Sequence, residues 1–188
     1  MSNDKINPNT LADGYVICIC EGAAEETIMN LLLDHDCLCF TRDNLVGHSI
    51  TRKRKASEIE REYLQRGYTK PVVILRILDS RSENFRLRPV YQERYPVYNI
   101  YTRPEIETLL IISEGAYDKY IKSKKSSLKP SLYCKEELSL GKHIKSKDFL
   151  EDYFCNIANL ICAITEYKRL RGQKEYCLAD AKAVIVVR

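Results

Sequence analysis

The chain has 188 residues, which suits one domain with a modest extension, and 45% of them are hydrophobic, which is enough for a core. Charged residues make up 30% of the chain and leave a formal net charge of +4, too small to indicate nucleic-acid binding by itself. No apolar run approaches the ~20 residues that cross a bilayer, and residues 1–12 lack the apolar segment of a signal peptide. These features exclude a membrane-spanning protein and predict a cytoplasmic one.

The beginning of the chain alternates between strand and helix patterns. Residues 1–13 are mostly polar and are predicted to be a disordered lead-in. Residues 15–20, with the sequence YVICIC, are continuously apolar, as expected for a strand buried on both faces. The strand ends at Glu21, and residues 23–34 then show the apolar spacing of a helix.

The middle of the chain contains the strongest strand signal. A short apolar segment at residues 37–40 predicts a second strand, and the polar, basic residues 41–55 predict a loop. Residues 56–66 have helical spacing. Residues 71–78 are rich in Val, Ile and Leu and predict a buried strand that ends at Asp79.

Helices dominate the later part of the chain. Residues 84–94 are a polar connection before a strand at 97–101, and Pro104 is expected to begin a helix that reaches residue 112. The apolar residues 183–187 fit a final strand or a segment that binds a partner. Four further helices are predicted, at residues 117–122, 130–138, 147–154 and 157–170.

The order of these elements predicts an α/β fold. Strands separated by helices favour a mainly parallel sheet with helices on both faces, here over residues 14–112. Residues 113–182 would form a helical C-terminal extension packed on this domain, and residues 183–188 a tail. Because ligands of such sheets bind beyond the carboxyl ends of the strands, Glu21 and Asp79 mark the expected site.

Acidic residues directly after apolar strands suggest a metal site. Buried charges are costly unless they are paired, and a divalent cation would relieve the repulsion between Glu21 and Asp79. Mg²⁺ prefers oxygen ligands and can polarise a phosphate. Glu25, four residues after Glu21, could share its face. Alternatively, Glu21 and Asp79 cap the following helices, or Asp79 pairs with Arg76 or Arg81.

Cysteines and basic residues each allow more than one interpretation. The pairs Cys18/Cys20 and Cys37/Cys39 alternate with Ile or Leu, which favours buried free thiols over a metal site or disulfides. The basic residues Arg52, Lys53, Arg54, Arg76 and Arg81 form either solvated faces or a track for a phosphate backbone.

Two short motifs resemble known families. The pattern strand-Glu21-Gly-x-x-Glu25-helix, followed by a strand ending in Asp79, resembles the Toprim fold of topoisomerases, primases and OLD-type nucleases. That resemblance implies Mg²⁺, or Mn²⁺, held by Glu21 and Asp79. The segment from Arg103 to Glu107 resembles the Asn-Pro-x-x-Glu helix start of RloB-like defence proteins and implies a catalytic role for Glu107.

The chain also departs from the Toprim pattern. Arg81 stands where the second acid of Asp-x-Asp is expected, Glu83 lies two residues further on, and Arg103 replaces the Asn before the proline. The site is therefore either a one-metal variant, with Glu83 or Glu25 completing the metal ligands, or a site that binds phosphate without catalysis.

The resemblance implies a function in bacterial anti-phage defence. The expected activity is that of a Mg²⁺-dependent nuclease acting on DNA or RNA phosphodiesters, with an ATPase partner and a homo-oligomer both compatible with it. Catalysis would use Glu21, Asp79 and Glu107, while Arg76, Arg81, Arg103 and the basic residues 52–54 would contact phosphate. The alternative is an inactive subunit that binds nucleic acid or a partner protein.

Overall fold

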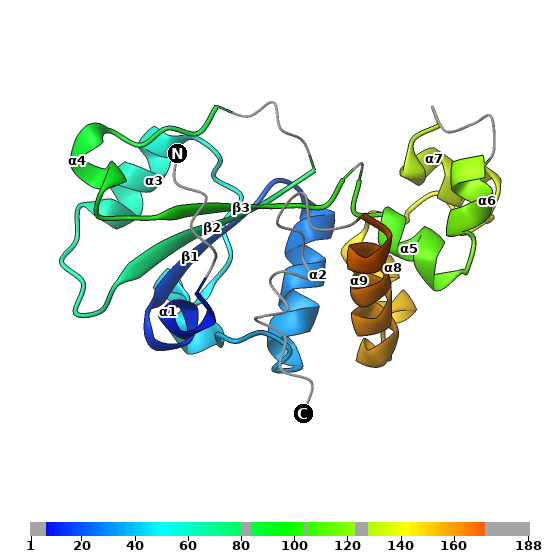
Figure 1. Cartoon of the computed structure of the whole chain (residues 1–188), viewed down its shortest axis with the longest axis horizontal. Coiled ribbons are helices and arrows are strands. Elements are labelled where there is room, and N and C mark those ends of the chain that lie inside the picture. Colours follow the sequence, from blue (N-terminus) through cyan, green and yellow to red (C-terminus); the bar gives the residue numbers. More distant parts are fainter. Residues whose placement is uncertain (1–6, 80–83, 104, 123–127, 172–188) are drawn as a thin grey trace.

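The computed structural model has an α/β architecture built on three parallel strands in the order β1-β2-β3 (Figure 1). The strands are β1 (Tyr15–Cys20), β2 (Val72–Leu78) and β3 (Val97–Tyr101). The structure describes residues 7–79, 84–103, 105–122 and 128–171. Within these residues, no helix combines the length and hydrophobicity that a membrane crossing needs.

The central strand, β2, is buried along its whole length because helices cover both faces of the sheet. On one face, α2 (Ala23–Asp34) and α5 (Thr108–Ser113) pack against alternate residues of β1 and β2. On the other face lie α3 (Ala56–Ile59) and α4 (Pro89–Gln92) (Figure 1). The predicted parallel sheet with helices on both faces is therefore present.

The loop predicted at residues 41–55 runs along the free edge of β1. It contains two short 3-10 turns, at Arg42–Asn44 and Val46–His48. Thr51 donates its N–H to the Cys18 carbonyl at 3.0 Å, and its own carbonyl accepts the Cys20 N–H at 2.9 Å. These bonds hold the basic residues that follow Thr51 at the end of β1. The chain then enters α3, which continues into a π-helical turn at Glu60–Leu64.

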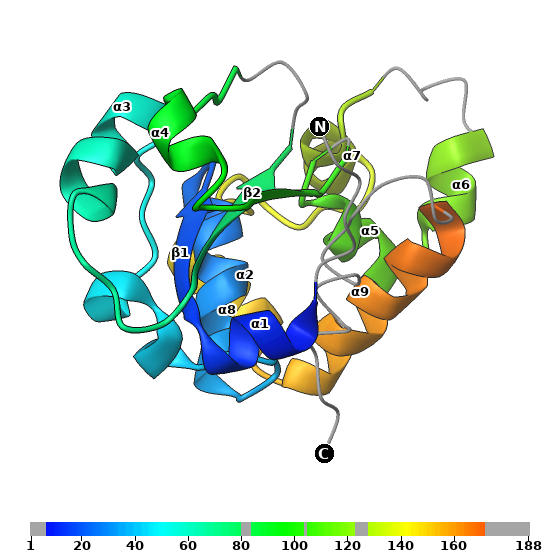
Figure 2. The same ribbon diagram turned by 60° about the vertical axis from the view of Figure 1, so that its left-hand side comes forward.

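The C-terminal helices share one hydrophobic core with the sheet. Leu150, Leu160 and Ile164 are buried in the same cluster as residues of α2 and α5. Figure 2 shows α9 running beside α5, with α8 behind α2. The expected boundary at residue 112 falls inside α5, so the helical part packs on the α/β part without a separate core. Its helices are α6 (Tyr117–Lys122), α7 (Pro130–Glu136), α8 (Lys147–Tyr153) and α9 (Ile157–Arg171), close to the predicted ranges.

The predicted disordered lead-in is partly wrong, because α1 (Pro8–Asp13) is a helix. Asn7 caps it by accepting the Asn9 N–H at 3.0 Å, and the proline occupies a favoured first-turn position. Leu11 anchors the helix in the core with 1% of its surface exposed. The remaining expected lead-in, residues 1–6, lies outside the described residues.

Two other predicted elements differ from the structure. Residues 37–40 form bends rather than a strand, because the Cys37 N–H bonds back to Leu32 at 2.8 Å and closes the end of α2. Their apolar side chains still pack into the core, which explains the strand-like composition. The helix expected from Pro104 begins at Thr108, after a turn in which the Thr108 N–H bonds to Glu105 at 3.1 Å. The apolar residues 183–187 lie outside the described residues.

Candidate functional site

The structure brings Glu21 and Asp79 together at the carboxyl edge of the sheet. β1 and β2 are parallel neighbours in which Cys20 lies opposite Ile77, so both strands end at the same edge. The Glu21 side chain reaches across to β2, where its Oε2 accepts the Asp79 N–H at 2.9 Å. Glu21 does not cap α2, because the cap residue is Gly22, which makes no side-chain bond. The cap interpretation of Glu21 was therefore wrong.

The two carboxyl groups interact strongly. Burial raises the pKa of Asp79, and a hydrogen bond with the Glu21 carboxylate and the charge of Glu21 raise it further. Two adjacent carboxylates repel each other, and a divalent cation bound to both would relieve that repulsion.

Glu25 lies beside this pair in the first turn of α2. Its side chain is 6% exposed, and a Cβ atom at Gly22 would come within 2.8 Å of its Oε2, so the glycine makes room for the carboxyl group. Burial, followed by the charges of Glu107 and Asp79, raises the pKa of Glu25 from 4.5 to about 7. Glu25 therefore belongs to the same electrostatic environment as Asp79 and Glu107.

Glu107 joins the group from the residue before α5. It is 2% exposed. The Lys145 ammonium forms an ion pair with Oε1 at 3.3 Å. Burial raises the pKa of Glu107, although Lys145 opposes the rise. Glu105 lies close enough to contribute to these shifts, and its Oε2 accepts the Ser131 N–H at 2.9 Å. We call Glu21, Glu25, Asp79, Glu105 and Glu107 the acidic site.

The basic residues 52–54 lie at the acidic end of β1 and pair with acids. Arg54 Nη1 lies 3.3 Å from Glu21 Oε1, and Arg52 Nε lies 3.3 Å from Glu26 Oε2. Lys53 forms an ion pair with Glu62. All three side chains are about half exposed, so they can exchange these partners for a phosphate group.

Arg76 does not lie where a phosphate could reach it, which corrects its predicted role. It is 2% exposed on β2, and its Nη1 donates to Asn99 Oδ1 at 3.1 Å. The guanidinium also stacks over the Phe85 ring at 4.3 Å, among the residues that pack against α3. An arginine at the centre of a buried strand is paired within the core rather than with a ligand.

The other predicted residues are placed only in part. Arg103 is half-buried, and its backbone carbonyl accepts the Tyr167 hydroxyl at 2.6 Å. Arg81 and Glu83 lie outside the described residues, so their predicted roles stay predictions. Sequence reasoning missed Lys145 and Glu105. Glu105 lay within the quoted helix-start motif, whereas nothing in the local sequence marks Lys145 out from other lysines.

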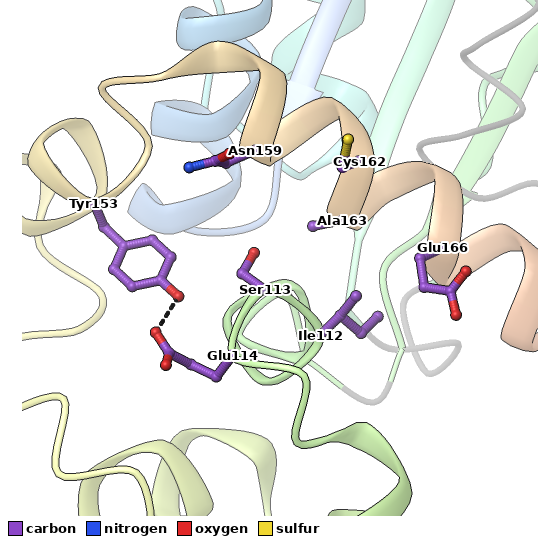
Figure 3. Close-up of a pocket in the computed structure, with 8 residues that line it drawn as sticks. All are labelled: Ile112, Ser113, Glu114, Tyr153, Asn159, Cys162, Ala163 and Glu166. Atoms are coloured by element: carbon purple, nitrogen blue, oxygen red, sulfur yellow. Dashed lines mark hydrogen bonds between the residues drawn. The ribbon is translucent and has the colours of Figure 1, made fainter.

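A separate cavity of about 560 Å³ lies between α5 and α9 (Figure 3). Tyr153 and Glu114 are neighbours in its lining, where the Tyr153 hydroxyl donates to Glu114 Oε1 at 2.6 Å (Figure 3). Its lining contains none of the residues of the acidic site. The cavity and the acidic site are therefore distinct features.

The side chains of the acidic site are carboxylates, the oxygen ligands that Mg²⁺ prefers in proteins. In the described part of the chain, no three His, Cys, Asp or Glu side chains are arranged to hold a metal ion. Glu21 and Asp79 supply a pair of carboxylates, and Mg²⁺ is commonly held by one or two carboxylates while it keeps its waters. The cysteines in the described ranges are free, and Cys18, Cys20 and Cys37 are buried. The donors that the acidic site offers are therefore carboxylate oxygens.

Comparisons with known proteins leave the family of the chain open. No protein-family model matches it, and neither the curated proteins nor the solved structures gave a significant match. The acidic site and the sequence motifs are therefore the features of this chain that bear on its function.

Proposed function

We propose that this protein is a Mg²⁺- or Mn²⁺-dependent nuclease of Toprim-like fold that hydrolyses DNA or RNA phosphodiesters. The observation that carries the proposal is the contact between Glu21 and Asp79 at the carboxyl edge of a parallel sheet. Two interacting carboxylates at this edge are the minimal protein contribution to a magnesium site.

The residues around the pair have roles that follow from their chemistry. Glu21 and Asp79 would hold the cation, which would supply Lewis-acid polarisation of a phosphate. Glu25, whose pKa burial and nearby carboxylates raise to about 7, can accept a proton near neutral pH. Arg54, half exposed beside Glu21, can contact a phosphate oxygen. Glu107 contributes negative charge from the opposite side of the site.

The biological setting of the proposal comes from the resemblance alone. RloB-like and OLD-type nucleases suggest an effector of bacterial anti-phage defence that acts with an ATPase partner.

A cleavage assay tests the proposal directly. The protein is incubated with single- and double-stranded DNA and RNA in Mg²⁺, in Mn²⁺ and in EDTA. Cleavage should require the cation and should fall at least about 100-fold in Glu21→Gln, because that variant removes a metal ligand and its charge. Glu26→Gln is the matched control, since Glu26 is a nearby acid in the first turn of α2 that pairs with Arg52 instead. Equal activity of wild type and Glu21→Gln would refute the assignment.

A second candidate is a subunit that binds nucleic acid or a partner without catalysis. It is favoured by the ion pairs of Arg54 and Lys145 with the acidic site, and by the absence of a three-ligand cluster in the described ranges. Nucleic-acid binding that needs no metal, survives Glu21→Gln and fails in Arg81→Ala would support this candidate. A stable complex on size-exclusion chromatography would identify a partner protein.

A further inference from the structure

Glu107 is a buried acid that depends on one neighbouring cation. It is 2% exposed. A buried carboxylate is costly unless a cation or hydrogen-bond donors accompany it. The Lys145 ammonium, 3.3 Å from Glu107 Oε1, supplies that positive charge.

The backbone on both sides of Lys145 is fixed. Ile144 is fully buried in the main core. On the other side, Ser146 caps α8 by accepting the Phe149 N–H at 3.3 Å, and its own N–H bonds to His143 at 2.8 Å. The fold therefore presents the lysine to the acidic site from a position anchored before and after it.

The charge of Lys145 extends beyond Glu107 to the rest of the acidic site. Burial lowers the pKa of Lys145, but the charges of Glu107, Glu105 and Glu25 outweigh this and raise it. Lys145 in turn opposes the rise in the pKa of Asp79. The ammonium thus stays charged and interacts with carboxyl groups on both sides of the site.

We infer that Lys145 is a built-in cation of the acidic site, occupying the position beside Glu107 that a second divalent ion would otherwise take. Two cations at one carboxylate repel each other, and a side chain tethered at the site has a high effective concentration there. The site consequently binds a single divalent ion, at Glu21 and Asp79. The location of that ion rests on the proposed function, whereas the exclusion of an ion at Glu107 rests on Lys145 alone.

The number of bound Mn²⁺ ions tests this inference. Free Mn²⁺ is measured by electron paramagnetic resonance while the wild type, Lys145→Gln and Lys147→Gln are titrated to saturation. We expect one equivalent in the wild type and two in Lys145→Gln. Lys147→Gln is the matched control and should bind one, because its ammonium lies 3.7 Å from Glu151 on the surface of α8.

Additional variants make the result specific to the position beside Glu107. Adding Glu107→Gln to Lys145→Gln should abolish the second equivalent, and Lys145→Arg should keep the count at one. Lys145→Met, which retains the aliphatic stem, is the second neutral variant if Lys145→Gln does not fold. Two equivalents in the wild type, or no additional ion in either folded neutral variant, would overturn the inference.

The same titration separates the inference from the proposed function. If the wild type binds one ion that Glu21→Gln loses, and the neutral Lys145 variants also bind only one, the proposed metal site stands and the inference fails. If the wild type binds no ion and the neutral variants bind one that requires Glu107, the inference stands and the proposed metal site fails.

Discussion

Replacing Glu25 with glutamine should stabilise the protein at alkaline pH while changing little in acid. Glu25 is 6% exposed, and burial together with the charges of Glu107 and Asp79 raises its pKa from 4.5 to about 7. A rise of this size, at ~1.4 kcal/mol per pH unit, corresponds to about 3 kcal/mol of unfolding free energy. Glutamine resembles the protonated acid in shape and carries no charge that burial would penalise.

The sign of the effect follows from proton binding. A carboxyl group with a raised pKa binds its proton more tightly in the folded state, so its contribution to stability is complete below pH ~4.5. That contribution is lost as the pH rises, and the loss is complete above pH ~7. Relative to the wild type, Glu25→Gln should therefore gain up to about 3 kcal/mol between pH 4.5 and pH 8.

Urea denaturation at several pH values in EDTA measures this difference. Glu26→Gln is the control, because Glu26 occupies the next position on α2 but contacts Arg52 at 3.3 Å and is more exposed. A difference between wild type and Glu25→Gln that stays flat from pH 5 to pH 8 would refute the electrostatic account of Glu25. A gain of the same size in Glu26→Gln would show that the effect belongs to the helix terminus rather than to the acidic site.

Three further substitutions test other contacts. Arg54→Gln should raise the Mg²⁺ affinity up to about fivefold in calorimetry. The reason is that an exposed ion pair worth ~0.2–1 kcal/mol no longer competes with the cation for Glu21. An unchanged affinity would contradict this. Glu60→Ala should lower the unfolding free energy by about 2 kcal/mol in urea titrations. Buried Glu60 accepts hydrogen bonds from the Arg88 N–H and Nε–H, each at 2.6 Å. A loss below ~0.5 kcal/mol would contradict this prediction. Leu11→Ala should cost about 3 kcal/mol by the same measurement, and a loss under ~1 kcal/mol would show that α1 is not part of the core.

Local sequence patterns determined most of the regular elements of this protein. The apolar run of β1 and the helical spacing of α2 are set by residues close in the chain, and both elements have the predicted bounds. The apolar spacing of the sequence likewise predicted the ends of α6 and α9 to within one residue. Strand ends marked by acids also identified Glu21 and Asp79 as neighbours, because parallel strands end at one edge of a sheet.

Segments whose conformation depends on distant contacts were predicted less well. Residues 37–40 have a strand-like composition, but they turn back onto α2 and pack their side chains without pairing. Arg76 is basic in sequence and buried in structure, since Asn99 and Phe85 from elsewhere in the chain surround it. Composition reports how a residue partitions between water and core on average, not which partner it meets.

The sequence by itself determined that an acidic edge exists, through Glu21, Glu25 and Asp79. Only the tertiary structure decided which positively charged side chain offsets the negative charge of this edge. Lys145 lies more than sixty residues beyond Asp79 in the sequence, and it reaches Glu107 because Ile144 is held in a core shared with the sheet and Ser146 caps α8. Electrostatic partners are selected by distance in space, and no local pattern encodes that distance.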